Sequence, residues 1–329
     1  MCPTLDQRNL IEVRNLSKSY GGKLAVDDLS FTVRPGSVTG FLGPNGAGKS
    51  TTMRLILGLD RPTAGTATID GAAYADLARP LCVVGALLEA GAVHPGRSAY
   101  DHLLYLAQTQ ALSARRVDQT LEMVGLEAVA HDRVGEFSLG MRQRLGIAAA
   151  LLGDPRVLIL DEPVNGLDPD GIFWFRNLMK YLAGQGRTVL VSSHLMAEMA
   201  LTADELIVIG RGRLIAQSST AEFIARNSEQ SVTVRAPDAI ALQELLVAAG
   251  GQVAVDEDGA LSVRQLDAAR IGDLAGGAGL VLHELSPQLA SLEEAFMERT
   301  HDTREFDVSD PTPSVEAATL ELVPERSAS

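Results

Sequence analysis

The sequence predicts an α/β fold built on a buried, largely parallel sheet, followed by a smaller α+β domain. Two runs carry most of this prediction. Residues 43–51 read Gly-Pro-Asn-Gly-Ala-Gly-Lys-Ser-Thr, a glycine-rich loop between an apolar run and a helical pattern. Residues 157–162 read Val-Leu-Ile-Leu-Asp-Glu, an apolar run that ends in two carboxylates. Continuous Val, Ile and Leu runs are typical of strands that are buried on both faces, as in a parallel sheet.

The strand candidates of the larger domain share apolar, β-branched residues bounded by turn signals. They are 10–13, 29–33, 37–42, 65–69, 83–88, 157–160, 188–192, 205–209 and 213–216. Apolar residues at three-to-four spacing predict helices over 50–58, 98–110, 114–124 and 138–152. The last three helices lie between the glycine-rich loop and the carboxylate strand. We therefore expect a helical insert over about 97–153 within a domain that spans 1–220.

A polar stretch over 219–230 is interpreted as a linker. After it the pattern predicts strand 231–235, helix 239–249, strands 252–255 and 261–263, helix 267–274, strand 280–284 and helix 291–299. This order is typical of a ferredoxin-like α+β domain, here over 231–300. It holds no cluster of His, Cys or paired carboxylates, so we expect a regulatory or dimer-supporting role. Residues 301–329 carry seven Asp or Glu against two Arg, which predicts an acidic, disordered tail.

Composition limits the class of protein. The length of 329 residues allows two domains, and no apolar run approaches the roughly 18 residues of a transmembrane helix. The net charge of −14 argues against broad nucleic-acid binding, which needs a basic face. Two cysteines and the lack of a secretory signal predict a cytoplasmic protein. Four Lys against 24 Arg, with abundant Ala and Gly, indicate a GC-rich bacterial source.

The loop over 43–51 predicts a nucleoside triphosphate site. Glycine lets the backbone approach phosphates closely, and consecutive N–H groups can wrap them at the start of a helix. Lys49 is expected to reach the β- and γ-phosphates, and Ser50 to ligate Mg²⁺. The whole loop is a candidate binding segment: Gly43, Pro44, Asn45, Gly46, Ala47, Gly48, Lys49, Ser50 and Thr51.

The two carboxylates at the end of the second run have separate expected roles. Asp161 is placed to hold Mg²⁺ with Ser50, through water, and Glu162 is the candidate to polarise the attacking water. The alternative for a strand that ends in two acids is an ordinary helix N-terminal region. The phosphate loop upstream favours the catalytic interpretation.

Three further residues are candidates from their positions. His194 follows a buried strand and can reach a γ-phosphate, although a lone His is more often a surface or core residue. Tyr20 precedes two glycines, and a ring on a turn can stack on a purine or be an ordinary exposed tyrosine. Ser138 is a good helix N-cap, and such a helix start can also bind an anion.

Taken in order, these motifs resemble the ATP-binding cassette subunit of an ABC transporter across residues 10–220. The match comprises Tyr20, the phosphate loop, the signature segment 138–144, the carboxylate strand, the Asn165-Gly166-Leu167-Asp168 turn and His194. The resemblance implies that two such subunits bind head to tail. Each ATP, with its Mg²⁺, would then lie between one phosphate loop and Ser138–Gly140 of the other chain. It also implies nucleotide-binding roles for Tyr20 (on adenine), Val26, His194 (on the γ-phosphate) and Asp168 (between the two sites).

Two departures from the usual family motifs narrow the resemblance to one branch of the family. The usual signature Leu-Ser-Gly-Gly-Gln reads Phe-Ser-Leu-Gly-Met over residues 137–141, which keeps the phosphate-facing Ser138 and Gly140. Where most members carry a glutamine, this chain has Glu89, which can ligate Mg²⁺ or its water but adds negative charge. Both departures resemble the bacitracin-resistance and lantibiotic-immunity branch of ABC-2 type exporters.

This resemblance implies a peripheral ATPase at the cytoplasmic face of a bacterial membrane. It would power export of an antibiotic, a peptide or a lipid-like molecule through separate polytopic membrane subunits, as a homodimer or a heterodimer. The alternative is a soluble ABC ATPase that acts on ribosomes or DNA. A single cassette, the lack of heptad arms and the acidic balance count against it. A third possibility is a subunit that binds ATP but hydrolyses it poorly; Glu162 argues against it, and Glu89 leaves it open.

Overall fold

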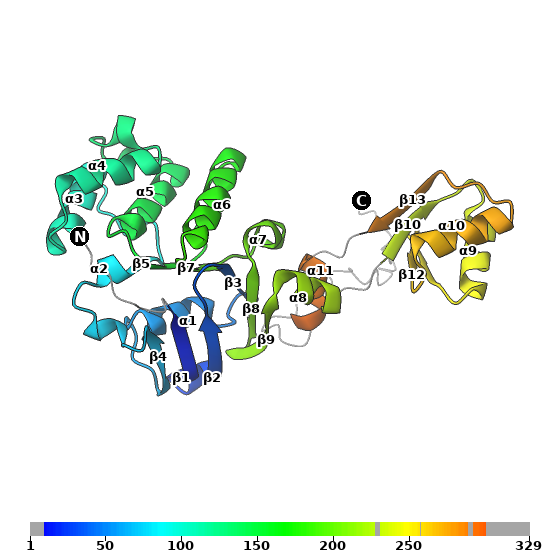
Figure 1. Cartoon of the computed structure of the whole chain (residues 1–329), viewed down its shortest axis with the longest axis horizontal. Helices are drawn as coiled ribbons and strands as arrows, with labels where there is room; N and C mark the ends of the chain where they lie inside the picture. Colours follow the sequence, from blue (N-terminus) through cyan, green and yellow to red (C-terminus); the bar gives the residue numbers. More distant parts are fainter. Residues whose placement is uncertain (1–9, 228–230, 257, 289–291, 301–329) are drawn as a thin grey trace, which may run out of the picture.

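The computed structural model describes residues 10–227, 231–256, 258–288 and 292–300. Figure 1 shows a larger α/β domain and a small domain at one end of it. The larger domain is built on a six-stranded sheet of order β5-β6-β7-β3-β8-β9. Its strands are β3 (Val38–Leu42), β5 (Val84–Leu87), β6 (Val157–Leu160), β7 (Thr188–Ser192), β8 (Glu205–Gly210) and β9 (Arg213–Ser219). All neighbours pair in parallel except β8 and β9, which confirms the predicted fold class.

Both faces of this sheet are buried, as its continuous apolar strands require. In β6, Leu158 and Leu160 pack into the core beneath the helical insert. Val157 and Ile159 point the other way, into a core shared with the second sheet. Successive side chains of a strand alternate between faces, so an uninterrupted apolar run serves two cores at once.

A second, antiparallel sheet lies on the other side of α1 (Lys49–Ile56). It has the order β2-β1-β4, with β1 (Ile11–Tyr20), β2 (Lys23–Val33) and β4 (Ala64–Ile69). The first two strands are much longer than predicted. Register shifts interrupt β1 after Val13, and the positive φ of Asn15 (47°) marks the irregularity. Such bulges break the alternation on which a strand prediction rests.

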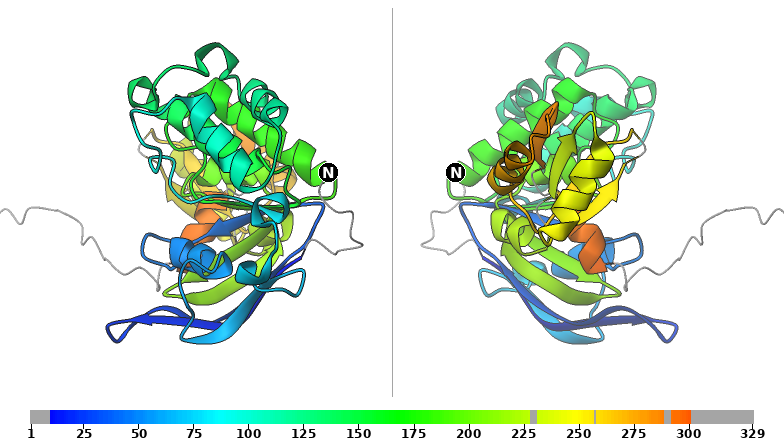
Figure 2. Two further views of the ribbon diagram at one scale, coloured as in Figure 1. Left: turned by 90° about the vertical axis from the view of Figure 1, so that its left-hand side faces the viewer. Right: turned by 90° about the vertical axis from the view of Figure 1, so that its right-hand side faces the viewer.

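Helices cover the opposite face of the six-stranded sheet, and Figure 2 shows them above it, with the antiparallel sheet below. The helical insert contains α3 (Ala99–Thr109), α4 (Ala114–Met123) and α5 (Leu139–Leu151), close to the predicted ranges. The other elements of the domain are α2 (Pro80–Val83), α6 (Pro169–Gly184), α7 (Met196–Thr202) and the short 3₁₀ turns Tyr74–Asp76, Glu127–Val129 and Val134–Glu136. The linker prediction was wrong over 220–227, which form α8 (Thr220–Asn227) with Phe223 buried in the main core.

The small domain has its own core around Val232, Leu246 and Ile271. Its elements are β10 (Ser231–Arg235), α9 (Ala239–Ala248), β11 (Gln252–Val255), β12 (Leu261–Arg264), α10 (Ala268–Gly277) and β13 (Glu284–Gln288). The strands form an antiparallel sheet of order β11-β12-β10-β13, the ferredoxin-like arrangement that the sequence predicts. The last strand begins at Glu284, where the predicted strand ended.

The final helix, α11 (Leu292–Thr300), returns to the larger domain. It packs against α8 and α7, and its Leu292, Ala295 and Phe296 lie in the main core of that domain. The sequence grouped this helix with the small domain. The predicted tail over 301–329 lies outside the described residues. Among the helices that the structure describes, none is both long enough and apolar enough to cross a lipid bilayer.

Replacing Phe296 by Ala is expected to lower the free energy of unfolding of the larger domain by about 3 kcal/mol, because it empties a site in the main core. Thermal unfolding followed with and without ATP, the ligand that the phosphate loop predicts for the larger domain, would locate the change, since a ligand stabilises the domain that binds it. Met297→Ala, on the same helix but exposed, is the matched control. An unchanged transition of the ATP-stabilised domain in Phe296→Ala would contradict the assignment of α11.

Candidate nucleotide site

The phosphate loop joins β3 to α1 and is packed against two other strands. Gly48 has a φ of 100°, and a side chain there would collide with the carbonyl oxygen of Ala25. A Cβ atom at Gly43 would lie only 2.6 Å from the carbonyl oxygen of Ile209. These contacts require glycine at both positions, which explains these two glycines without reference to a ligand. They also hold the loop rigidly at the carboxyl end of β3.

Lys49 is buried at the start of α1, with an exposed fraction of 9%. Its Nζ donates to the carbonyl oxygens of Gly43 at 2.6 Å and Pro44 at 3.3 Å. Burial lowers the pKa of Lys49, while the nearby charges of Glu162 and Asp161 raise it. The lysine therefore lies between the loop and the carboxylate strand, where a phosphate chain would meet both. Ser50 is exposed in the first turn of α1, and Thr51 is half-buried.

A cavity of about 450 Å³ opens beside the loop. It is lined by Tyr20, Lys23, Leu24, Ala25, Pro44, Asn45, Gly46, Ala47 and Arg211. Tyr20 is 47% exposed, and its hydroxyl donates to Asp60 Oδ2 at 2.9 Å. Loss of solvent and this hydrogen bond raise the pKa of Tyr20. The hydrogen bond also fixes the direction of the ring.

The lining of this cavity differs in part from the sequence prediction. Val26 is fully buried behind the loop, and its neighbours Leu24 and Ala25 line the cavity in its place. Arg211 was not predicted. It lies in the β8–β9 turn, where the N–H of Gly212 donates to the carbonyl oxygen of Ala47 at 3.0 Å. Arg211 reaches the cavity only because the β8–β9 turn contacts the distant phosphate loop. No local sequence pattern therefore indicates that it lines the cavity.

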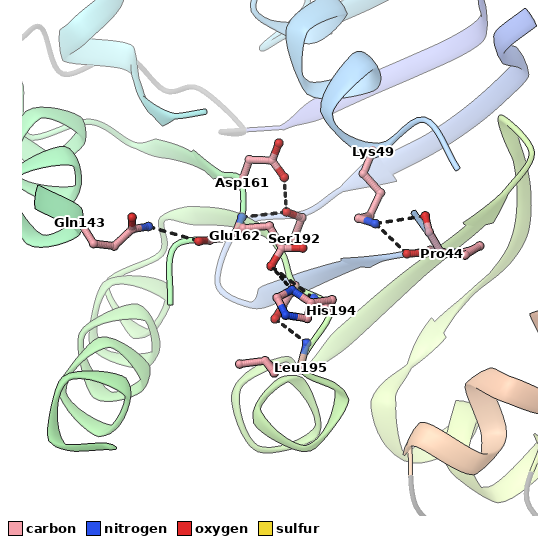
Figure 3. A network of polar contacts seen from close by, with 10 residues as sticks. Pro44, Lys49, Gln143, Asp161, Glu162, Ser192, His194 and Leu195 are labelled. Atoms are coloured by element: carbon pink, nitrogen blue, oxygen red, sulfur yellow. Dashed lines mark hydrogen bonds and ion pairs between the residues drawn. The ribbon is translucent and has the colours of Figure 1, made fainter. Parts of the chain in front are cut away.

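The predicted catalytic residues meet at the carboxyl ends of β6 and β7, as Figure 3 shows. The Nδ1 atom of His194 lies 2.8 Å from Oε2 of Glu162, and the His194 backbone N–H donates to the same oxygen at 3.3 Å. Ser192 Oγ donates to Asp161 Oδ1 and accepts from the Glu162 N–H at 3.0 Å. Gln143 Nε2 donates to the Glu162 carbonyl oxygen at 3.2 Å. Ser192 and Gln143 were not predicted, although a hydroxyl at the end of a buried strand is a visible signal.

The signature segment begins α5, on the other side of the six-stranded sheet from α1. Ser138 is exposed, and its Oγ accepts from the N–H of Met141 at 3.2 Å. Gly140 packs so closely on the Asn165–Asp168 turn that a Cβ atom there would lie 2.9 Å from the Gly166 carbonyl oxygen. Asp168 caps α6 by accepting from the Gly171 N–H at 2.9 Å. The signature segment and this turn therefore form one unit within the chain.

The candidate ligands for Mg²⁺ are Ser50, Glu89 and Asp161. Within the described residues, no three His, Cys, Asp or Glu side chains gather closely enough to hold a metal by themselves. Mg²⁺ is usually held by one or two carboxylates together with phosphate and water oxygens, so a smaller set suffices. Ser192 donates to Oδ1 of Asp161, so a cation or its water would be held by Oδ2. Ser50 and Glu89 are both exposed, and Glu89 follows β5, the neighbour of β6. One hydroxyl and two carboxylates are oxygen donors of the kind that Mg²⁺ takes.

Comparison with known proteins gives two family matches and many relatives. The family described as ABC transporter matches residues 26–165, and a domain of unknown function matches residues 230–293. The uncharacterized ABC transporter ATP-binding protein YhcH of Bacillus subtilis (strain 168) is 37% identical, over 91% of this chain and 98% of its own. The bacitracin transport ATP-binding protein BcrA of Bacillus licheniformis is 41% identical, over 63% and 68%. The lantibiotic transport ATP-binding protein SrtF of Streptococcus pyogenes is 36% identical, over 63% and 89%.

Solved structures of ABC cassettes resemble the larger domain in fold. The ATP-binding subunit of an ABC transporter has a TM-score of 0.61 and 30% identity, over 66% of this chain and 92% of that one. The dimeric structure of MJ0796, a bacterial ABC transporter cassette, has a TM-score of 0.59 and 26% identity, over 64% and 98%.

Replacing Tyr20 by Ala is expected to weaken ATP binding by about 5- to 150-fold, since base stacking on an aromatic ring contributes about 1–3 kcal/mol. Tyr20→Phe keeps the ring but removes the hydrogen bond to Asp60, so its loss should be much smaller. Calorimetric titration of both variants with ATP measures the difference. Equal affinities of the Ala variant and the native chain would exclude a stacking role.

Proposed function

Because this chain belongs to the ATP-binding subunits of ABC transporters, we propose that it powers export by the alternate closure and reopening of two cassettes around ATP. The chain is an ATPase whose hydrolysis is coupled to transport. Subunits of this family dimerise and work with membrane permease subunits. A nucleotide that binds the closed dimer more tightly than the open one would drive the conformational exchange.

The Glu162–His194 contact beside Lys49 is the observation that carries the proposed chemistry. The phosphate loop and Lys49 hold the triphosphate, and the Glu162 carboxylate polarises a water aimed at the γ-phosphorus. His194 keeps this carboxylate in place and contacts the γ-phosphate. Ser50, Asp161 and Glu89 would hold Mg²⁺, whose positive charge would offset the negative charge of the phosphates. Water attacks the γ-phosphorus and gives a proton to the Glu162 carboxylate. The bond between the γ-phosphorus and the bridging oxygen of the β-phosphate breaks, and ADP and phosphate leave.

We assign the second half of the site to a partner cassette, bound head to tail. Ser138 and Gly140 would offer a hydroxyl and backbone N–H groups at a helix start to the γ-phosphate of the other chain. The exposure of Ser138 supports this arrangement, as does the packing of Gly140 on the turn that ends in Asp168. That packing would let one nucleotide site of the dimer respond to nucleotide binding or hydrolysis at the other.

The substrate class follows from the relatives alone. BcrA and SrtF carry bacitracin and lantibiotic transport in their names, which supports export of an antibiotic, a peptide or a lipid-like molecule. The permease subunits would select it, with this chain at the cytoplasmic face of the membrane. The ribosome- or DNA-acting alternative finds no support among these relatives.

Replacing Glu162 by Gln is expected to lower kcat by about 100-fold or more, because the amide cannot accept a proton from the attacking water. ATP binding should persist, so the variant should accumulate as a nucleotide-bound dimer in size-exclusion chromatography with light scattering. Glu122→Gln, an exposed change on α4, is the control for a lost surface charge. Unchanged hydrolysis by Glu162→Gln would refute the catalytic role.

The same trapped variant tests the transport partner. Tagged Glu162→Gln protein, solubilised gently from source cells with ATP and Mg²⁺, should co-purify with a polytopic membrane protein at roughly equal amount. Recovery of ribosomes or DNA-bound proteins without a membrane partner would move the assignment to a soluble ATPase.

Glu89→Gln tests the metal role of the residue that departs from the family pattern. Loss of one charged ligand is expected to raise the Mg²⁺ concentration at half-maximal hydrolysis by about tenfold, the effect of one charge-assisted contact. Turnover at saturating Mg²⁺ should change less. If the Mg²⁺ dependence and turnover both match those of the native chain, Glu89 is not a ligand.

A further inference from the structure

The hydroxyl group of Ser192 contacts both the carboxylate of Asp161 and the backbone N–H of Glu162. It is the last residue of β7 and is fully buried, with an exposed fraction of 0%. Strand β7 pairs in parallel with β6, in a register that sets Val191 opposite Leu160. The carboxyl ends of both strands therefore meet, and Ser192 lies beside Asp161 and Glu162.

The hydroxyl of Ser192 has both of its hydrogen-bonding functions engaged. Its single proton goes to Oδ1 of Asp161, and an oxygen lone pair accepts the Glu162 N–H at 3.0 Å. Burial strengthens such bonds, since little water competes for them. The hydrogen bond from Ser192 holds Oδ1 of the Asp161 carboxylate, so the proposed metal contact of Asp161 falls to Oδ2.

The backbone of Glu162 depends on the same hydroxyl. Its φ of 48° lies in the left-handed region, which is unfavourable for a residue other than glycine. Two contacts hold this conformation: the N–H donates to Ser192 Oγ, and the carbonyl oxygen accepts from Gln143 Nε2. From this backbone the side chain reaches His194.

We propose that Ser192 is a positioning residue for hydrolysis, whose hydroxyl orients both Asp161 for the metal and Glu162 for the water. The inference rests on the proposed roles of those two carboxylates. The adjacent Ser193 has a different task, because its Oγ accepts from the Leu195 N–H at 3.0 Å. Ser192 itself would touch neither nucleotide nor metal.

The test compares Ser192→Thr with Ser192→Val. The two side chains have nearly the same shape, so both add a methyl group to the buried strand end, and only threonine keeps the hydroxyl. We expect the Val variant to lose about 10- to 100-fold in kcat relative to the Thr variant, as for a removed hydrogen bond to a charged group. Its Mg²⁺ requirement should rise as well. The KM for ATP should stay within about twofold, because the phosphate loop is untouched.

Equal kcat and equal Mg²⁺ dependence in active Thr and Val variants would overturn the inference. If the added methyl group inactivates both, Ser192→Ala decides the question. A lowered kcat with unchanged ATP affinity in the Ala variant supports positioning, and native turnover overturns it.

Glu162→Gln in the same assay separates this inference from the proposed function. Unchanged hydrolysis there refutes the role of Glu162 itself. An inactive Glu162→Gln beside a fully active Ser192→Val refutes only the role of Ser192.

Discussion

The parallel register of three strands is the constraint on which the rest of the site depends. Phe41 of β3 pairs with Ser192 of β7, and Leu160 of β6 pairs with Val191. All three strands therefore end at one edge of the sheet. The phosphate loop, the carboxylate pair and His194 follow these ends directly. Segments that are more than a hundred residues apart in sequence meet because hydrogen bonds within the sheet leave the strands no freedom to slip.

Much of the fold could be predicted because its signals are local. Buried strands such as β6 and β7 are continuous apolar runs, and α5 has a serine cap and helical spacing. The predictions are wrong where long-range contacts decide the structure of a segment. Bulges extend β1 beyond its visible alternation, and α8 is polar in sequence but buries Phe223 in a core formed by distant residues. The helix α6 was missed, although Asp168 and Pro169 provide an N-cap and a first-turn proline.

The candidate site shows the same division between features with local signals and features that depend on long-range contacts. The phosphate loop and the Asp161–Glu162 pair could be predicted because each motif is contiguous. Other contacts need two strands or a distant turn to be paired first: the contact of Glu162 with His194, the hydrogen bonds of Ser192, and the place of Arg211 beside the cavity at the phosphate loop. Val26, which the resemblance also implies, packs behind the loop while its neighbours line the cavity, and its role in nucleotide binding stays a prediction.

The return of α11 to the larger domain has a consequence for how the chain is made. That domain cannot complete its core until Phe296 has been synthesised, after the whole small domain. Entropy opposes the closure of so long a loop, and the cost grows with loop length. The small domain shortens this loop, because Ser231 at its start pairs with Gln288 at its end. Once the small domain has folded, α11 starts close to α8. Folding of the small domain therefore assists folding of the larger domain that surrounds it in sequence.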